Sequence, residues 1–134
     1  MSIELIAVAL ETALAGMSPG LDTAFDNDKH TPPNASTPYQ KATTLFAKPN
    51  NQEYGSTHQE LGYMQVDLMY PTGVSRGDVD ARAELLRTTF ARGESFTSGG
   101  VTAIISETPE VMPGRKEGER YRVPVKIPFY ANIT

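Results

Sequence analysis

Ten residues near the end of the chain, from Tyr121 to Tyr130, read "YRVPVKIPFY" and alternate apolar with polar side chains, as a half-buried strand does. Pro124 and Pro128 stand inside this alternation, although a proline has no N–H group to donate to a β-ladder. Both prolines have the same parity, so their nitrogens point toward the same edge of the strand. We therefore expect the strand to lie at a sheet edge, at least locally, with both prolines facing outward. Partners would then use this edge through side chains, or not at all, rather than through a continuous backbone ladder.

Two segments have the apolar spacing of amphipathic helices. Residues 2–16 form the first, which Gly16 ends, and residues 78–91 form the second, which Gly93 ends. The side chains that we expect on the two buried helix faces are Ile3, Ile6, Leu10 and Leu14, and Val79, Ala83, Leu86 and Phe90.

Strand patterns fill much of the remaining chain. We expect a short strand within 22–26 and longer strands at 39–46, 61–71, 99–107 and in the final segment, with long polar loops at 26–38 and 47–59. The strand 61–71 places Met64, Val66, Leu68 and Tyr70 on one face, and Gln65 and Asp67 on the other. One-sided strands of this kind favour an antiparallel sheet. The predicted fold is a single α+β domain over residues 1–134, in the order α-β-β-β-α-β-β. It has a mostly antiparallel sheet of about four to five strands, with two helices packed on one face.

The composition excludes several classes of protein. The chain has 134 residues, 39% of them hydrophobic, which suits one globular domain. No cysteine is present, so disulfides, thiolate metal sites and cysteine nucleophiles are absent. No stretch approaches the roughly 20 apolar residues of a membrane span, and the start of the chain lacks the basic region of a secretory signal. A net charge of −4 does not favour sequence-specific binding of nucleic acid.

Motifs that would carry chemistry are missing. His30 and His58 each lie in a polar loop without a second metal ligand at the right spacing, and we expect both to be exposed to solvent. The acidic residues within 78–84 lack the glycine and the later glutamate of a calcium loop. Neither a phosphate-binding glycine loop nor a nucleophile elbow is present. The sequence therefore predicts a protein that is not an enzyme and has no catalytic residue, metal or cofactor.

Charge and aromatic residues instead indicate a surface for protein partners. Residues 51–100 hold seven acids and four bases, whereas residues 101–134 hold four acids and five bases. Such segments can form a charge-complementary contact, and tyrosine and arginine are favoured at interfaces. The candidate interface residues are Tyr39, Tyr54, Asp67, Arg115, Lys116, Arg122, Lys126 and Tyr130.

The order of four segments is similar to that of the tail terminator-like (tail completion) proteins of long-tailed bacteriophages. After the first helix these segments read "TPYQKATTLFA", "GYMQVDLMYPTG", "SFTSGGVTAIIS" and "ERYRVPVKIPFYA". The resemblance spans Met1 to about Ala131, and the second and fourth strings are its most specific parts.

This resemblance implies a structural virion protein that forms a ring, commonly a hexamer, at the head-proximal end of the tail tube. Such a ring ends tube polymerisation and presents a docking surface to the head-neck connector. The implied partners are further copies of the chain, the tail tube protein and a neck or head-completion protein, with no membrane, and DNA can pass through the ring lumen. The implied locations are the virion tail and, during assembly, the host cytoplasm.

Two alternatives remain open at this point. The protein could be a neck or head-completion component, since those are also small ring-forming proteins. It could also be a small enzyme or ligand-binding module that uses His30, His58 or Asp67. A solvated or interface-paired carboxylate is the simpler account of Asp67.

Overall fold

The computed structural model describes residues 2–17, 22–25, 37–48, 58–73, 76–118 and 120–133, and two helices and eight strands lie within them. The helices are α1 (Ser2–Ala15) and α2 (Arg76–Thr89). The strands are β1 (Asp22–Ala24), β2 (Tyr39–Phe46), β3 (His58–Pro71), β4 (Ser95–Ser98), β5 (Val101–Ile105), β6 (Glu110–Val111), β7 (Arg115–Glu117) and β8 (Arg120–Ile133).

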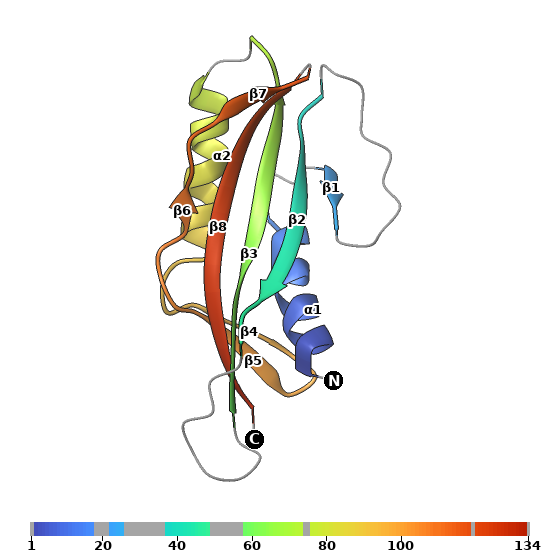
Figure 1. The fold of residues 1–134 in the computed structure, drawn as a ribbon, viewed down its shortest axis with the longest axis vertical. Coiled ribbons are helices and arrows are strands. Elements are labelled where there is room, and N and C mark those ends of the chain that lie inside the picture. The colour runs from blue at the N-terminus through green and yellow to red at the C-terminus, as the bar shows by residue number, and fades with distance from the viewer. Residues whose placement is uncertain are drawn as a thin grey trace.

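All eight strands join one curled sheet. Its main path runs β1-β2-β3-β8-β5-β4, and β6 and β7 pair with β8 beside β5 (Figure 1). Strands β3 and β8 form its centre, since they pair antiparallel over their whole length, from His58 opposite Ile133 to Pro71 opposite Arg120. The contact of β1 with β2 is parallel, whereas every other pairing is antiparallel. The α+β class is confirmed.

Both helices lie behind the sheet in Figure 1 and cover one face of it. Every second residue of β3 and β8 turns toward them, and the register places Met64 opposite Ile127 and Val66 opposite Val125. The predicted buried face of α2 is confirmed for all four residues, as is that of α1 from Ile6 onward. Ile3 is an exception: it lies in the first turn of α1 and is 53% exposed.

The predicted edge position of the last strand is wrong, because β8 lies inside the sheet with β3 on one side. On its other side β8 pairs with three short strands in turn: β5, then β6, then β7. The two prolines face this second side, since the carbonyl oxygen of Pro128 accepts from the N–H of Ser106 (3.1 Å) and that of Pro124 from Met112 (2.9 Å). In an antiparallel ladder, the nitrogen and the carbonyl of one residue point to the same neighbour.

Each proline marks the place where a partner strand leaves β8. Ser106 immediately follows β5, and Met112 immediately follows β6. Because a proline cannot donate, the partner chain makes one bond to its carbonyl and loses the return bond there. The two prolines therefore face one edge of β8, as their shared parity predicts. This edge of β8 is not left unpaired; it pairs in turn with three short strands.

The sheet has more strands than the four or five expected, for two reasons. The strand expected over 99–107 begins only at Val101, because Gly99 and Gly100, at φ +55° and +83°, form a two-residue turn that joins it to the additional strand β4. Residues 108–118, for which no strand was expected, contain the short strands β6 and β7. Strands of two or three residues are too short to show an alternation in sequence.

Boundaries elsewhere shift by a few residues. Helix α2 starts and ends two residues before the predicted 78–91, and β3 starts at His58, inside the predicted loop 47–59. His58 is therefore not the exposed loop histidine that we expected. Its side chain is 26% exposed, and its Nε2 lies 2.8 Å from the Glu60 carboxylate. His30 and most of both predicted loops lie outside the described residues.

Candidate protein interface on the outer sheet face

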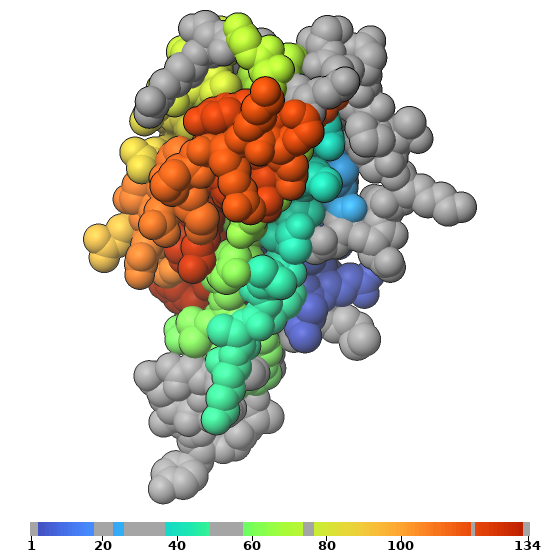
Figure 2. Space-filling view, turned by 45° about the horizontal axis from the view of Figure 1, so that its top comes forward, coloured from blue at the N-terminus to red at the C-terminus, as the bar shows by residue number. Residues whose placement is uncertain are grey.

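The sheet face turned away from the two helices, here called the outer face, carries most of the predicted interface residues. Strand parity puts even-numbered residues of β8 on this face together with odd-numbered residues of β3, and the register places Asp67 opposite Pro124 and Gln65 opposite Lys126. Figure 2 shows β2 and β3 open at the surface on this side, with the segment containing β6 and β7 beside them.

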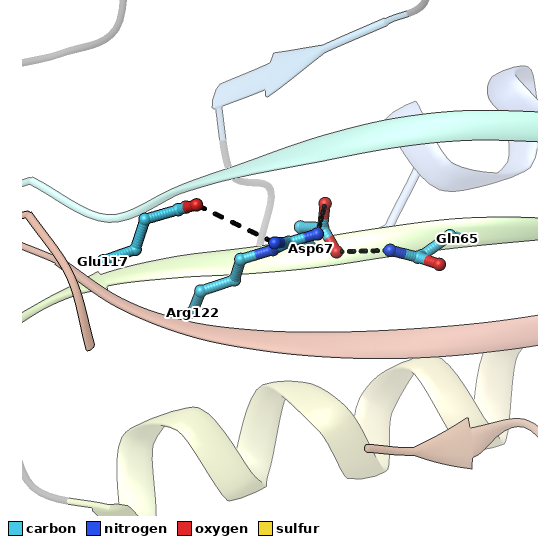
Figure 3. A network of polar contacts seen from close by, with 4 residues as sticks. All are labelled: Gln65, Asp67, Glu117 and Arg122. Atoms are coloured by element: carbon cyan, nitrogen blue, oxygen red, sulfur yellow. Dashed lines mark hydrogen bonds and ion pairs between the residues drawn. The ribbon is translucent and has the colours of Figure 1, made fainter. Parts of the chain in front are cut away.

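Asp67 is the centre of a polar network that joins three strands (Figure 3). Arg122 on β8 places Nη2 3.1 Å from Asp67 Oδ2, and Gln65 Nε2 donates to Asp67 Oδ1 at 3.0 Å. On its other side, Arg122 Nη1 lies 3.8 Å from the Glu117 carboxylate on β7. The side chains of Asp67 and Arg122 are only 12% and 22% exposed, although no helix covers this face.

This geometry gives Asp67 a structural task. Both of its oxygens accept charge-assisted or amide hydrogen bonds, which hold the carboxylate in place and tie β3 to β8. A residue that acts as a general base needs an oxygen that can approach a substrate proton. The pairing fits the interpretation of Asp67 as a paired carboxylate better than a catalytic one.

Lys126 and Tyr130 lie further along β8 on the same face. The Lys126 ammonium stands 4.3 Å from the centre of the Tyr63 ring, a cation–π contact across β3 and β8. Tyr130 is half-buried and lies between Leu61 and Ile104 in the register. The end of the outer face near the C-terminus is therefore aromatic and apolar, and the end near β7 is charged.

The two basic residues of β7 are both exposed but lie differently. Arg115 is opposite Arg122 and so belongs to the outer face, whereas Lys116 is opposite Tyr121 and has the other parity. Two guanidinium groups side by side repel one another unless acids intervene. Glu117 lies beside Arg122 and offsets part of that repulsion.

The predicted tyrosines have different outcomes. Tyr39 is only 5% exposed, with the Arg120 guanidinium stacked 4.6 Å from its ring centre. Arg120 is held in turn by the carbonyl oxygens of Thr37 and Met69, at 2.7 and 3.4 Å. In the single chain Tyr39 therefore packs under Arg120 and offers little surface. Tyr54 lies outside the described residues.

The residues that complete these contacts were not among the interface residues predicted from the sequence; they are Tyr63, Gln65, Glu117 and Arg120. The signal that finds Tyr63 and Gln65 is the register of β3 on β8, since they lie opposite Pro128 and Lys126. Pairing the two strongest strand patterns of the chain in antiparallel register would have identified them. Glu117 could not be found this way, because β7 has no pattern of its own.

A second polar cluster lies on the inner side, between the sheet and α2. Gln40 is fully buried; its Nε2 donates to Thr23 Oγ1 at 2.9 Å, and its Oε1 accepts from Arg82 at 3.3 Å. Burial raises the pKa of the nearby Tyr70 phenol; the charge of Arg82 opposes this effect, and Asp78 adds to it. Burial likewise lowers the pKa of Arg82. This cluster ties β1, β2 and α2 together inside the molecule, away from the outer face.

Other kinds of site have no support in the described part of the chain. No group of three or more His, Cys, Asp or Glu side chains there could hold a metal ion. Neither described helix is long and apolar enough to cross a membrane.

Comparison with known proteins identifies a matching family. The family model described as "Phage tail terminator protein" matches residues 5–129. Among solved structures, 16 chains match, and one superposes with a TM-score of 0.79 at 24% sequence identity, covering 100% of this chain and 97% of its own. That structural likeness supports the fold alone. Among curated protein sequences, none matches.

Proposed function

The chain belongs to the phage tail terminator family, a family of structural proteins of the virion tail, and from this premise we propose that it forms a ring at the head-proximal end of the tail tube. In that position the ring ends polymerisation of the tube and offers its free side to the neck connector. The partners proposed are further copies of the chain, the tail tube protein and a neck or head-completion protein. Assembly takes place in the host cytoplasm.

The observation that carries the proposal is the family match over residues 5–129. The outer face supports it, because basic, aromatic and proline side chains gather there without a covering helix. Interfaces are enriched in tyrosine and arginine relative to the remaining surface. The candidate residues for contacts between proteins are Asp67, Arg115, Arg122, Lys126 and Tyr130 on the outer face, Tyr39 on the same face beneath Arg120, and Lys116 and Tyr54.

Polymerisation of purified tail tube protein tests the proposal. Light scattering would follow tube growth with and without this chain at increasing molar ratios. We expect growth to stop at lengths that shorten as the chain is added, because a cap removes growing ends and does not consume free subunits. Growth that is unchanged at a molar excess of the chain over tube ends would contradict tube termination. Binding only to a neck or portal assembly would instead place the protein on the connector.

A further inference from the structure

The two broad sides of the molecule carry opposite charge. Helix α1 contains no lysine or arginine, and its exposed residues include Glu4. Helix α2 exposes Asp78 and Glu84, the latter with 71% of its side chain in solvent, and its Glu84–Arg87 contact of 3.7 Å is a weak surface pair. We call the exposed surface of these two helices the helix layer; among its described side chains, the exposed carboxylates of Glu4, Asp78, Asp80 and Glu84 outnumber the one partly exposed base, Arg87, and make the layer acidic.

The outer face has the reverse character. Lys41 and Arg115 are exposed, and Arg122 and Lys126 are partly exposed. Asp67 and Glu117 both lie beside Arg122, whose single charge offsets only one of these two carboxylates. With Glu110, which is exposed opposite Lys126, the four bases stand against three acids, and the face is weakly basic. A basic surface and an acidic surface therefore lie on opposite sides of one chain.

Of the four large hydrophobic side chains that are exposed in the described residues, three lie toward one end of the long axis, and Tyr121 lies at the other end, opposite Lys116 of β7. In Figure 1, α2 lies toward the end that carries β7, and α1 lies toward the end where β8 finishes. At this second end the helix layer exposes Ile3 and Val8, at 53% and 43%. The outer face there exposes Leu45 at 44%, in the same region as the half-buried Tyr130. When two copies stack face to back with their long axes parallel, the acids of α2 meet the bases near β7 at one end, and apolar side chains meet at the other end, where Glu4 is also exposed.

We infer that a second copy of this chain is the partner of the outer face, and that it contributes its helix layer with the long axes parallel. This contact rests on the proposed ring and defines how its subunits meet. The two surfaces differ and lie on opposite sides of the chain, so the contact is heterologous and each copy has one of each surface to offer. Repetition of a heterologous contact gives a ring when the rotation closes. A two-fold dimer through the outer face would instead place basic surfaces against one another.

Thiol cross-linking tests the contact directly, because the chain has no cysteine of its own. The variant Glu84→Cys/Lys126→Cys puts one thiol on each surface, and a short bismaleimide would join them only between copies. We expect a ladder of covalent oligomers that ends in one closed species. The single variants should give no species beyond a dimer. The matched control Thr72→Cys/Lys126→Cys keeps one thiol and moves the other to the exposed turn after β3, outside both surfaces; it should give no ladder.

Charge reversal gives a second readout that needs no reagent. Lys126→Glu and Glu84→Lys should each raise the concentration of half-assembly, measured by light scattering after gel filtration, by about tenfold, because each places like charges across the contact. The combined variant should restore most of the original affinity. Circular dichroism would confirm that each variant is folded, as we expect for partly exposed side chains.

The outcomes separate this inference from the proposed function. If both charge-reversal variants form rings of unchanged stability and cross-linking gives no ladder, the inferred contact is wrong but the proposed ring is supported. A chain that stays monomeric at every concentration also overturns the inference. The tube-growth assay then decides independently whether the chain terminates tubes. A ladder together with charge rescue supports the contact.

Discussion

Among single residues, Asp67 shows how a side chain that points away from the core of the sheet can still be buried. The strand pattern placed it opposite the core, where solvent would be expected, yet Arg122 and Gln65 enclose its carboxylate. An ion pair with this little exposure depends on both partners, because removal of one leaves the other charge poorly solvated.

Replacing Asp67 with alanine should therefore destabilise the fold. Loss of two hydrogen bonds to a charged group, with Arg122 left near Glu117 only, should lower the free energy of unfolding by about 1–3 kcal/mol. Urea denaturation would measure it. Glu117→Gln is the matched control, since Glu117 is 52% exposed, and it should cost no more than about 0.5 kcal/mol. Equal effects of the two changes would contradict the central position of Asp67.

Because the Tyr70 phenol is buried, we expect the fold to lose stability at alkaline pH. Burial holds the pKa of its phenol above the ordinary value in the folded chain, whereas the unfolded chain releases this proton near pH 10, at about the reference pKa. The contribution of Tyr70 to the free energy of unfolding is fully present below that pH. It falls as the pH rises toward the pKa of the folded state, because over this range only the unfolded state is stabilised by ionisation. Tyr70→Phe should show a shallower decline in the free energy of unfolding between neutral and strongly alkaline pH. An identical decline in both proteins would refute the assignment.

At the scale of elements, the two longest strands could be read from the sequence and the shortest could not. Alternation over ten residues identified β8, and its parity correctly turned Pro124 and Pro128 to one side. The interior position of β8 could not be read, because the pattern of β5 does not show which strand it pairs with, and β6 and β7 are only two and three residues long. Such strands form only where β8 offers its backbone, so tertiary contacts decide them and local pattern does not.

Gly62 of β3 lies where a side chain would have no room beside β2. A Cβ atom there would collide with the carbonyl oxygen of Leu45 and would lie 3.0 Å from the Phe129 ring and 3.1 Å from Phe46 Cα. Gly62→Ala should thus push β2 away and cost about 1–3 kcal/mol, as overpacking does. Gly16→Ala provides the comparison, because its Cβ would meet nothing closer than 3.4 Å. Urea midpoints that shift equally for both variants would argue against the collision.

For the whole molecule, the fold class and the family could be predicted from the sequence, whereas the arrangement of the interaction surfaces could not. The segment order predicted a tail terminator-like protein, and the family match confirms the family. The candidate interface residues were chosen by type, and strand parity places six of the eight on the outer face, including Tyr39 opposite Met69. Tyr39 differs because Arg120 covers it, a contact between residues 81 positions apart that no local pattern signals.

We propose that this chain caps one end of a tail tube as a ring, and electron microscopy of tubes grown with the purified chain is the sharpest test of that proposal. We expect a ring on one end of most tubes, always the same end as judged from tube polarity, and tubes of limited length. Bare ends, or the chain scattered along the tube walls without rings, would contradict it.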